Sequence, residues 1–400
     1  MLIAATFGAG RDTDAYFLSY AAALAIGGVI SQAVEVAIVP FAARELGAGR
    51  AAATRFLDST ASRIAGTAAI VWLLAMAVSW TVARPDVRPS VLRYGACFAP
   101  LVVAWCASAT YSGGLISRDA IGRATGSMMG RGVGGVIALI LMPRSVGLAA
   151  VAIGLGVGEI ARAFWMRKEL VSLVPSEGVR SAGTQPFATA ATAQLAAVAA
   201  NGMAPLGERI MAASLGAGAV SHLEYASRLL VVPQLVFDGA LSPLLLSRWS
   251  RAAALDGRPP AARDVLAEVS RGIVLAGVIA SLVWFTGSFW VRLLLHHGEF
   301  GDRDAQIVTT LLRALSIGFI ASMGAVLLER FFMATAQNWT LAALSVVRLA
   351  TRLGVAFATV ASLGLMAFTV GFAAAECVYL GLLIVRLLVA DRDRRLVGSA

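Results

Sequence analysis

Charged residues are scarce in this 400-residue chain. Asp, Glu, Lys and Arg make up 14% of it, whereas a soluble domain carries about 25%. Apolar residues make up 58%, and they recur in blocks of about 20 residues, the length that crosses the hydrocarbon core of a bilayer. The composition excludes an ordinary soluble domain and predicts an all-α polytopic membrane protein.

Residues that carry hydrolytic or redox chemistry are also few. The chain has three cysteines and three histidines, and none stands in a CxxC, Cys/His or HExxH spacing. The sequence also shows no Walker motif, no nucleophile–base pair and no paired catalytic carboxylates. We therefore predict no enzyme activity, no metal and no cofactor. The pattern favours a secondary transporter driven by the membrane potential or by a monovalent cation.

The net charge of +10 does not indicate nucleic-acid binding. The arginines are spread over short loops between apolar blocks, with no aromatic interleaving and no single basic tract. Such spacing is typical of topology signals in membrane proteins. The predicted partner is the lipid bilayer, with no nucleic acid.

The apolar blocks predict about twelve transmembrane helices. A short apolar start, Leu2–Phe7, is expected to be the end of a first helix that is incomplete in this chain. The further expected spans are Ala15–Ala43, Ile64–Val82, Tyr94–Leu115, Ala120–Met142, Val146–Met166, Phe187–Leu215, Val220–Leu246, Ile273–Leu295, Ile307–Met333, Leu341–Leu363 and Met366–Val389.

A polar interval, Arg167–Pro186, divides these helices into two sets. Its Gly, Pro and Ser content is typical of a linker. We expect an N-terminal lobe at residues 1–166, with the helix stub and five transmembrane helices, and a cytoplasmic linker at 167–186. A C-terminal lobe at 187–400 would hold six helices and a basic tail. Two such lobes suit alternating access, in which bundles rock around a central site.

The loop charges predict an orientation. If the short apolar start begins on the cytoplasmic side, most loop arginines fall in cytoplasmic loops, as the positive-inside rule requires. The C-terminus, with Arg392, Arg394 and Arg395, is then cytoplasmic.

Four charged residues, Glu208, Arg209, Glu224 and Arg228, lie inside or beside apolar runs that are long enough to span a bilayer. A charge at the middle of a spanning helix costs about 2.5–3.5 kcal/mol on insertion scales. Such charges persist only where they face protein, water or a polar substrate. We therefore predict that the segment from Glu208 to Leu229 lines a transport cavity.

Four segments resemble the MurJ/MviN family of lipid II flippases. FGAGRDTDAYFLSY, from Phe7 to Tyr20, is similar to the family's FGAG-x-x-TDAFF segment. The segment from Glu208 to Leu229 resembles its D-R…G-x-V-S-x-L-x-YA-x-RL segment. LLHHGEFGDRDAQIVTTLLRALSIGF and ERFFMATAQNWT are similar to two further segments, in the family's order and across most of the chain.

The resemblance implies the two-lobed helical bundle of the MOP exporter superfamily. It further implies movement of an undecaprenyl-diphosphate-linked glycan from the inner to the outer leaflet of the bacterial inner membrane, beside the cell-envelope glycan synthesis machinery. The chain departs from the family in three places. It starts after the G-F-x-R-D segment, and Ala22–Ile30 has no basic residue where the family has an arginine pair. The expected helices also end after about twelve, whereas the lipid II flippases commonly add two C-terminal helices.

A diphosphate headgroup is suited to arginine, because the planar guanidinium donates two parallel hydrogen bonds and stays charged. The resemblance indicates Arg228, from the YA-x-RL motif, and Asp14, from the TDAFF motif. The predicted substrate-binding set is Arg228, Arg209, Glu208, Asp14, Arg11, Glu224, Arg348 and Arg352.

Structural ion pairs are the alternative role for these residues. The expected pairs are Arg228 with Glu224 or Glu208, and Arg348 or Arg352 with Glu376 or Glu329.

The first lobe also contains charges within apolar segments. Glu159 and Arg162 are expected to form a local pair near a helix end. Arg131 lies in the glycine-rich segment GSMMGRGVGG, whose small residues favour close helix packing over phosphate binding.

Three other functions stay open beside the lipid II flippase. One is an exporter of lipid-linked exopolysaccharide or O-antigen units, which the missing arginines favour. Another is a cation-coupled multidrug antiporter, for which Glu35 is the best acidic candidate in the first lobe. The last is a scaffold or regulatory protein that has lost transport.

Overall fold

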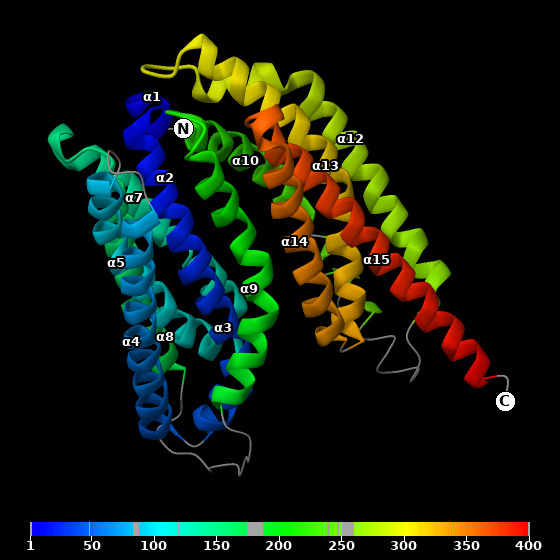
Figure 1. Cartoon of the computed structure of the whole chain (residues 1–400). Helices are drawn as coiled ribbons and strands as arrows, with labels where there is room; N and C mark the ends of the chain where they lie inside the picture. Colours follow the sequence, from blue (N-terminus) through cyan, green and yellow to red (C-terminus); the bar gives the residue numbers. More distant parts are fainter. Residues whose placement is uncertain are drawn as a thin grey trace. The chain divides into compact units, whose positions relative to one another are not determined.

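The computed structural model of the chain consists of helices and their connections (Figure 1). It describes residues 2–47, 49–82, 88–118, 120–173, 187–237, 241–242, 244–245, 248–249, 260–335 and 337–398. Within these ranges there is no β-strand. The prediction of an all-α protein is confirmed.

The described residues form two compact units, of which the first comprises Arg11–Leu206. Its centre is α5, which packs against α2, α3, α4 and α8, while α7 packs against α8. The elements are α2 (Arg11–Ala23), the π-helical turn η1 (Leu24–Gly28), α3 (Val29–Gly47), α4 (Arg50–Val82), α5 (Arg88–Ile116), α6 (Ile121–Gly126), α7 (Met129–Leu141), the short η2 (Arg144–Val146), α8 (Ala149–Ser172) and most of α9 (Phe187–Ala212).

The second unit comprises Met1–Gly10 and Gly207–Ala400. Its central helix is α13, which packs against α10, α12 and α15, and α14 packs against α15. The elements are α1 (Leu2–Phe7), the end of α9, α10 (Ala219–Val236), α12 (Ala262–Leu295), α13 (Asp302–Ala334), α14 (Asn338–Leu363) and α15 (Met366–Gly398).

Nine helical segments in the described ranges are long and apolar enough to cross a membrane. They match the expected spans in order. The two other expected spans, Phe187–Leu215 and Val220–Leu246, contain α9 and α10. The chain is a polytopic membrane protein.

Two helices begin well before their expected spans. The spans were expected to start at Ile64 and Ile273, whereas α4 begins at Arg50 and α12 at Ala262. Hydropathy detects only the part of a helix that crosses hydrocarbon. The charged turns before it are helical as well, so several arginines expected in loops lie on helices.

The expected linker, 167–186, falls largely outside the described residues, since only 167–173 is described and 167–172 belongs to α8. The division into units differs from the expected lobes at both ends: residues 1–10 belong to the second unit and 187–206 to the first. The lobe boundaries drawn from the sequence stay a prediction.

α7 and α8 approach each other closely at glycines. A Cβ atom on Gly134 would lie 2.5 Å from the carbonyl oxygen of Gly154, and one on Gly158 would lie 2.7 Å from that of Gly130. Contacts that short are incompatible with a Cβ atom, so the small residues permit this packing. The prediction that the glycine-rich segment serves helix packing is confirmed.

We expect Gly158→Ala to lower the free energy of unfolding by about 1–3 kcal/mol, because the added methyl group overpacks the α7–α8 contact. The matched control is Gly132→Ala on α7, where an added Cβ atom meets nothing within 4 Å. That substitution is expected to be neutral or slightly stabilising. Unfolding of the detergent-purified protein, followed by tryptophan fluorescence, gives both values. Equal stabilities for the two variants would contradict the packing argument.

Candidate functional site

Five charged residues of the second unit form a row of alternating charge, which we call the ion chain. It runs Arg352–Glu208–Arg209–Glu224–Arg228. Three helices supply it: α9 carries the second and third residues, α10 the last two, and α14 the first. The fold thereby joins side chains as far as 144 positions apart in the sequence.

The first contact of the ion chain is a bidentate salt bridge between Arg352 and Glu208. Arg352 Nε donates to Glu208 Oε1 at 2.6 Å, and a second guanidinium nitrogen donates to Glu208 Oε2 at 2.9 Å. The Arg352 guanidinium also lies 4.8 Å from the centre of the Phe372 ring. Paired donors of this kind fix the carboxylate in direction as well as in position.

Arg209 lies between the two glutamates. One of its nitrogens is 3.2 Å from Glu208 Oε2, and two others donate to Glu224 Oε2 at 2.9 and 3.2 Å. All three side chains are buried. Because a buried charge is stable only when it is paired, these contacts are a condition for folding α9 against its neighbours.

Arg228 is the last residue of the ion chain and differs from the others in exposure. Its Nε donates to Glu224 Oε1 at 2.8 Å, one helical turn earlier on α10. Its side chain stays 44% exposed, whereas that of Glu224 is 7% exposed. The exposed end of the ion chain is therefore an arginine.

Arg348 pairs with a different set of residues. It donates to Glu376 Oε1 at 2.6 and 2.9 Å, lies 3.5 Å from Glu329 Oε1, and has its guanidinium 4.9 Å from the centre of the Tyr379 ring. The structural alternative proposed for Arg348 from the sequence is therefore observed. For Arg352 the expected partners were wrong, because its carboxylate partner is Glu208.

Arg11 and Asp14 belong to the first unit, at the start of α2. Arg11 is exposed and Asp14 is buried. Nearby, the Tyr94 hydroxyl donates to Asp12 at 2.5 Å, and Tyr94 packs edge-on against Tyr16. The predicted set is thus divided between the two units: five members form the ion chain, and Arg348, Arg11 and Asp14 lie elsewhere.

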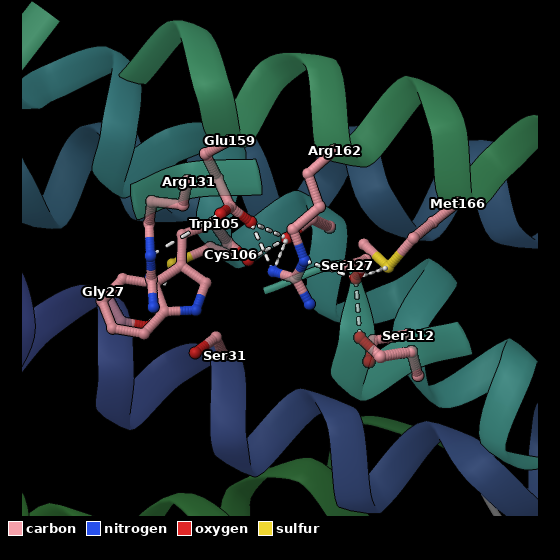
Figure 2. A network of polar contacts seen from close by, with 12 residues as sticks. Gly27, Ser31, Trp105, Cys106, Ser112, Ser127, Arg131, Glu159, Arg162 and Met166 are labelled. Atoms are coloured by element: carbon pink, nitrogen blue, oxygen red, sulfur yellow. Dashed lines mark hydrogen bonds and ion pairs between the residues drawn. The ribbon is translucent and has the colours of Figure 1, made fainter. Parts of the chain in front are cut away.

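A polar network in the first unit joins α5, α7 and α8 (Figure 2). Arg162 and Glu159, three residues apart on α8, form a salt bridge of 2.7 Å. The predicted local pair is confirmed, but its expected position near a helix end is wrong, because both residues lie in the middle of α8. Ser108 on α5 donates to the same carboxylate at 2.5 Å, and Ser127 accepts from Arg162 Nε at 2.8 Å.

The sequence reasoning did not identify the two serines, Ser108 and Ser127, as members of this network. Serine is a frequent packing residue in membrane helices, so its presence alone does not indicate a polar network. The position of these serines beside a buried carboxylate depends on how α5, α6 and α8 pack.

Comparison with known proteins gives a consistent picture. The family model described as "Lipid II flippase MurJ" matches residues 3–394. Among solved structures, the chain is similar to a lipid II flippase MurJ in an inward closed conformation, with a TM-score of 0.76 and 18% identity over 98% of this chain and 83% of that one. The curated proteins give no match.

Two further solved structures are similar. An inward-facing multidrug resistance MATE family transporter of the MOP superfamily has a TM-score of 0.78 and 11% identity, over 98% of this chain and 93% of that one. A MOP superfamily transporter from Pyrococcus furiosus has a TM-score of 0.67 and 13% identity, over 96% and 88%. Identities this low show the fold alone, so the chain has the MOP flippase fold.

Proposed function

This chain belongs to the MurJ family of lipid II flippases, and on that premise we propose that it moves lipid II across the bacterial inner membrane. Lipid II is the undecaprenyl-diphosphate-linked precursor of peptidoglycan. The proposed process is alternating access of two helical lobes, without a chemical step on the substrate.

The ion chain is the observation that supports a lipid-diphosphate substrate. A diphosphate must cross the membrane core shielded from hydrocarbon, and a guanidinium can form a bidentate pair with two of its oxygens. Arg228 presents a half-exposed guanidinium in the middle of α10. We assign it the contact with the diphosphate.

The remaining members of the ion chain hold Arg228 in position. Glu224 fixes the Arg228 guanidinium and is in turn fixed by Arg209. Glu208 and Arg352 extend this support to α9 and α14. Each of the two carboxylates is shared by two arginines, and the half-exposed Arg228 is the member of the ion chain that an anionic headgroup could reach.

The energy source, orientation and partners follow from the same proposal. We infer that transport is driven by the membrane potential or by a monovalent cation, and that the C-terminus is cytoplasmic. The protein would receive its substrate from the cell-envelope glycan synthesis machinery.

Complementation of a bacterial strain depleted of its lipid II flippase tests the proposal. The chain is expected to restore growth and cell shape, with membrane insertion confirmed by immunoblotting of the membrane fraction. Inserted protein without rescue would contradict lipid II transport. Rescue instead of a strain that lacks its O-antigen or exopolysaccharide exporter would identify another lipid-linked glycan as the substrate.

A further inference from the structure

A charged group outside the ion chain lies in the first unit and includes Arg131 of α7. Arg131, Glu159 and Arg162 all lie near the middle of candidate membrane spans, Gly122–Leu141 for the first and Ala149–Ser172 for the other two. Ionisable side chains at this depth are found facing a bundle interior or a polar cavity, because exposure to hydrocarbon is costly. The contacts of these three side chains therefore show how each charge is shielded from hydrocarbon.

Arg162 takes the short contact with Glu159. Its salt bridge to Glu159 Oε1 measures 2.7 Å, while Arg131 Nε is 3.9 Å from Glu159 Oε2. Among the described residues, two buried atoms, Arg131 Nη1 and Glu159 Oε2, have no hydrogen-bond partner. Because a buried donor without a partner is unfavourable, a further acceptor beside the Arg131 guanidinium would stabilise it.

Trp105 holds the Arg131 guanidinium in place. The guanidinium carbon lies 4.1 Å from the centre of the indole ring, within the range of a cation–π contact. The ring in turn packs beside Gly27, where an added Cβ atom would lie 3.0 Å from it. Gly27 belongs to the π-helical turn η1, a form frequent at functional sites. Figure 2 shows Arg131, Trp105 and Gly27 gathered beside Glu159.

Exposure separates Arg131 from its neighbours. Its side chain is 24% exposed, whereas those of Glu159 and Arg162 are almost fully buried. Large apolar side chains, including Val133, Ile137 and Ile140, form the exposed surface of α7. The Arg131 guanidinium instead contacts Trp105 on α5, so it is directed toward a neighbouring helix of the bundle while part of the side chain stays exposed.

We propose that Arg131 binds an oxyanion of the transported headgroup, either a phosphate or a carboxylate. Arg162 neutralises Glu159, which leaves the charge of Arg131 available to the ligand, and Trp105 sets the direction of the guanidinium. Glu35 on α3 accepts a hydrogen bond from Ser112 at 3.0 Å. The inference deepens the proposed function and rests on it, because it adds a substrate contact in the first unit.

The test is binding of two probes, undecaprenyl diphosphate and lipid II, to purified full-length protein in detergent. Arg131→Gln is expected to weaken binding about 10-fold or more, the effect of losing one charge-assisted contact, with an unchanged melting temperature. Arg131→Lys should restore part of the affinity. The matched control is Arg123→Gln on α6, an exposed arginine paired with Glu169, which should bind like the wild type.

The two probes distinguish the source of the oxyanion. Weaker binding of both assigns Arg131 to a phosphate, and weaker binding of lipid II alone assigns it to a peptide carboxylate. Unchanged affinity for both would overturn the inference. So would a lowered melting temperature that Arg131→Lys does not restore, since this indicates a structural role.

The inference and the proposed function can fail separately. If the wild type binds undecaprenyl diphosphate but not lipid II, the lipid II function fails, and Arg131→Gln still decides the inference on the diphosphate probe. If Arg228→Ala weakens lipid II binding and Arg131→Gln does not, the inference fails alone. Binding of neither probe would overturn both.

Discussion

Replacing Arg228 by alanine is expected to abolish transport while leaving membrane insertion intact. Hydrogen bonds to charged groups contribute about 1.5–3 kcal/mol each, so losing the bidentate contact with the diphosphate lowers substrate affinity by about 100-fold or more. The side chain is 44% exposed and lies at the end of the ion chain, and its partner Glu224 keeps the salt bridge to Arg209, so its removal does not leave a buried carboxylate unpaired. The measurement is rescue of the flippase-depleted strain at matched protein levels.

The matched control for this variant is Arg167→Ala. Arg167 on α8 is 43% exposed and pairs with Asp58 at 2.7 Å, so it resembles Arg228 in exposure and in having a carboxylate partner. We expect it to be dispensable for transport, and Arg228→Lys to give partial activity because it keeps the charge but not the planar fork. Full activity of Arg228→Ala would rule out the assigned contact.

Replacing Glu208 by glutamine is expected to lower the free energy of unfolding by about 3–5 kcal/mol, the cost of breaking a buried ion pair from one side. Glu208 is fully enclosed and holds both Arg352 and Arg209. Without its charge, Arg352 loses the carboxylate of its salt bridge, and Arg209 keeps only Glu224 of the two glutamates. Chemical unfolding of the detergent-purified protein, followed by tryptophan fluorescence, measures the loss.

A double variant separates this pairing from general damage to the fold. Glu208→Gln combined with Arg352→Gln removes both partners of the bidentate salt bridge. The double variant should recover part of the stability that Glu208→Gln alone loses. Additive losses in the double variant would show that the two residues act independently. A loss below about 1 kcal/mol for Glu208→Gln alone would contradict the buried charge network.

The helices could be predicted from the sequence, and their true ends could not. The apolar blocks gave the order of the spans because each must satisfy its backbone hydrogen bonds inside the membrane. Hydropathy could not predict the early start of α4 at Arg50 and of α12 at Ala262. Those turns are helical but charged.

Local charged contacts could be predicted from spacing, and of the expected contacts between helices Arg348–Glu376 is observed whereas those of Arg352 are not. The pairs Arg162–Glu159 and Arg228–Glu224 follow from helical spacing of three and four residues, which places two side chains on one face. The pair Arg352–Glu208 connects α14 with α9. Nothing in the sequence fixes how these helices pack, so their pairing required the structure.

The most direct test of the central claim is lipid II translocation by the purified protein in liposomes. Lipid II with a fluorescent label on its headgroup is placed in both leaflets, a membrane potential is imposed, and an impermeant quencher reports the label that reaches the outer leaflet. Wild-type protein is expected to translocate lipid II well above protein-free liposomes, and Arg228→Ala to match them. Wild-type protein that translocates no more lipid II than empty liposomes would contradict the account.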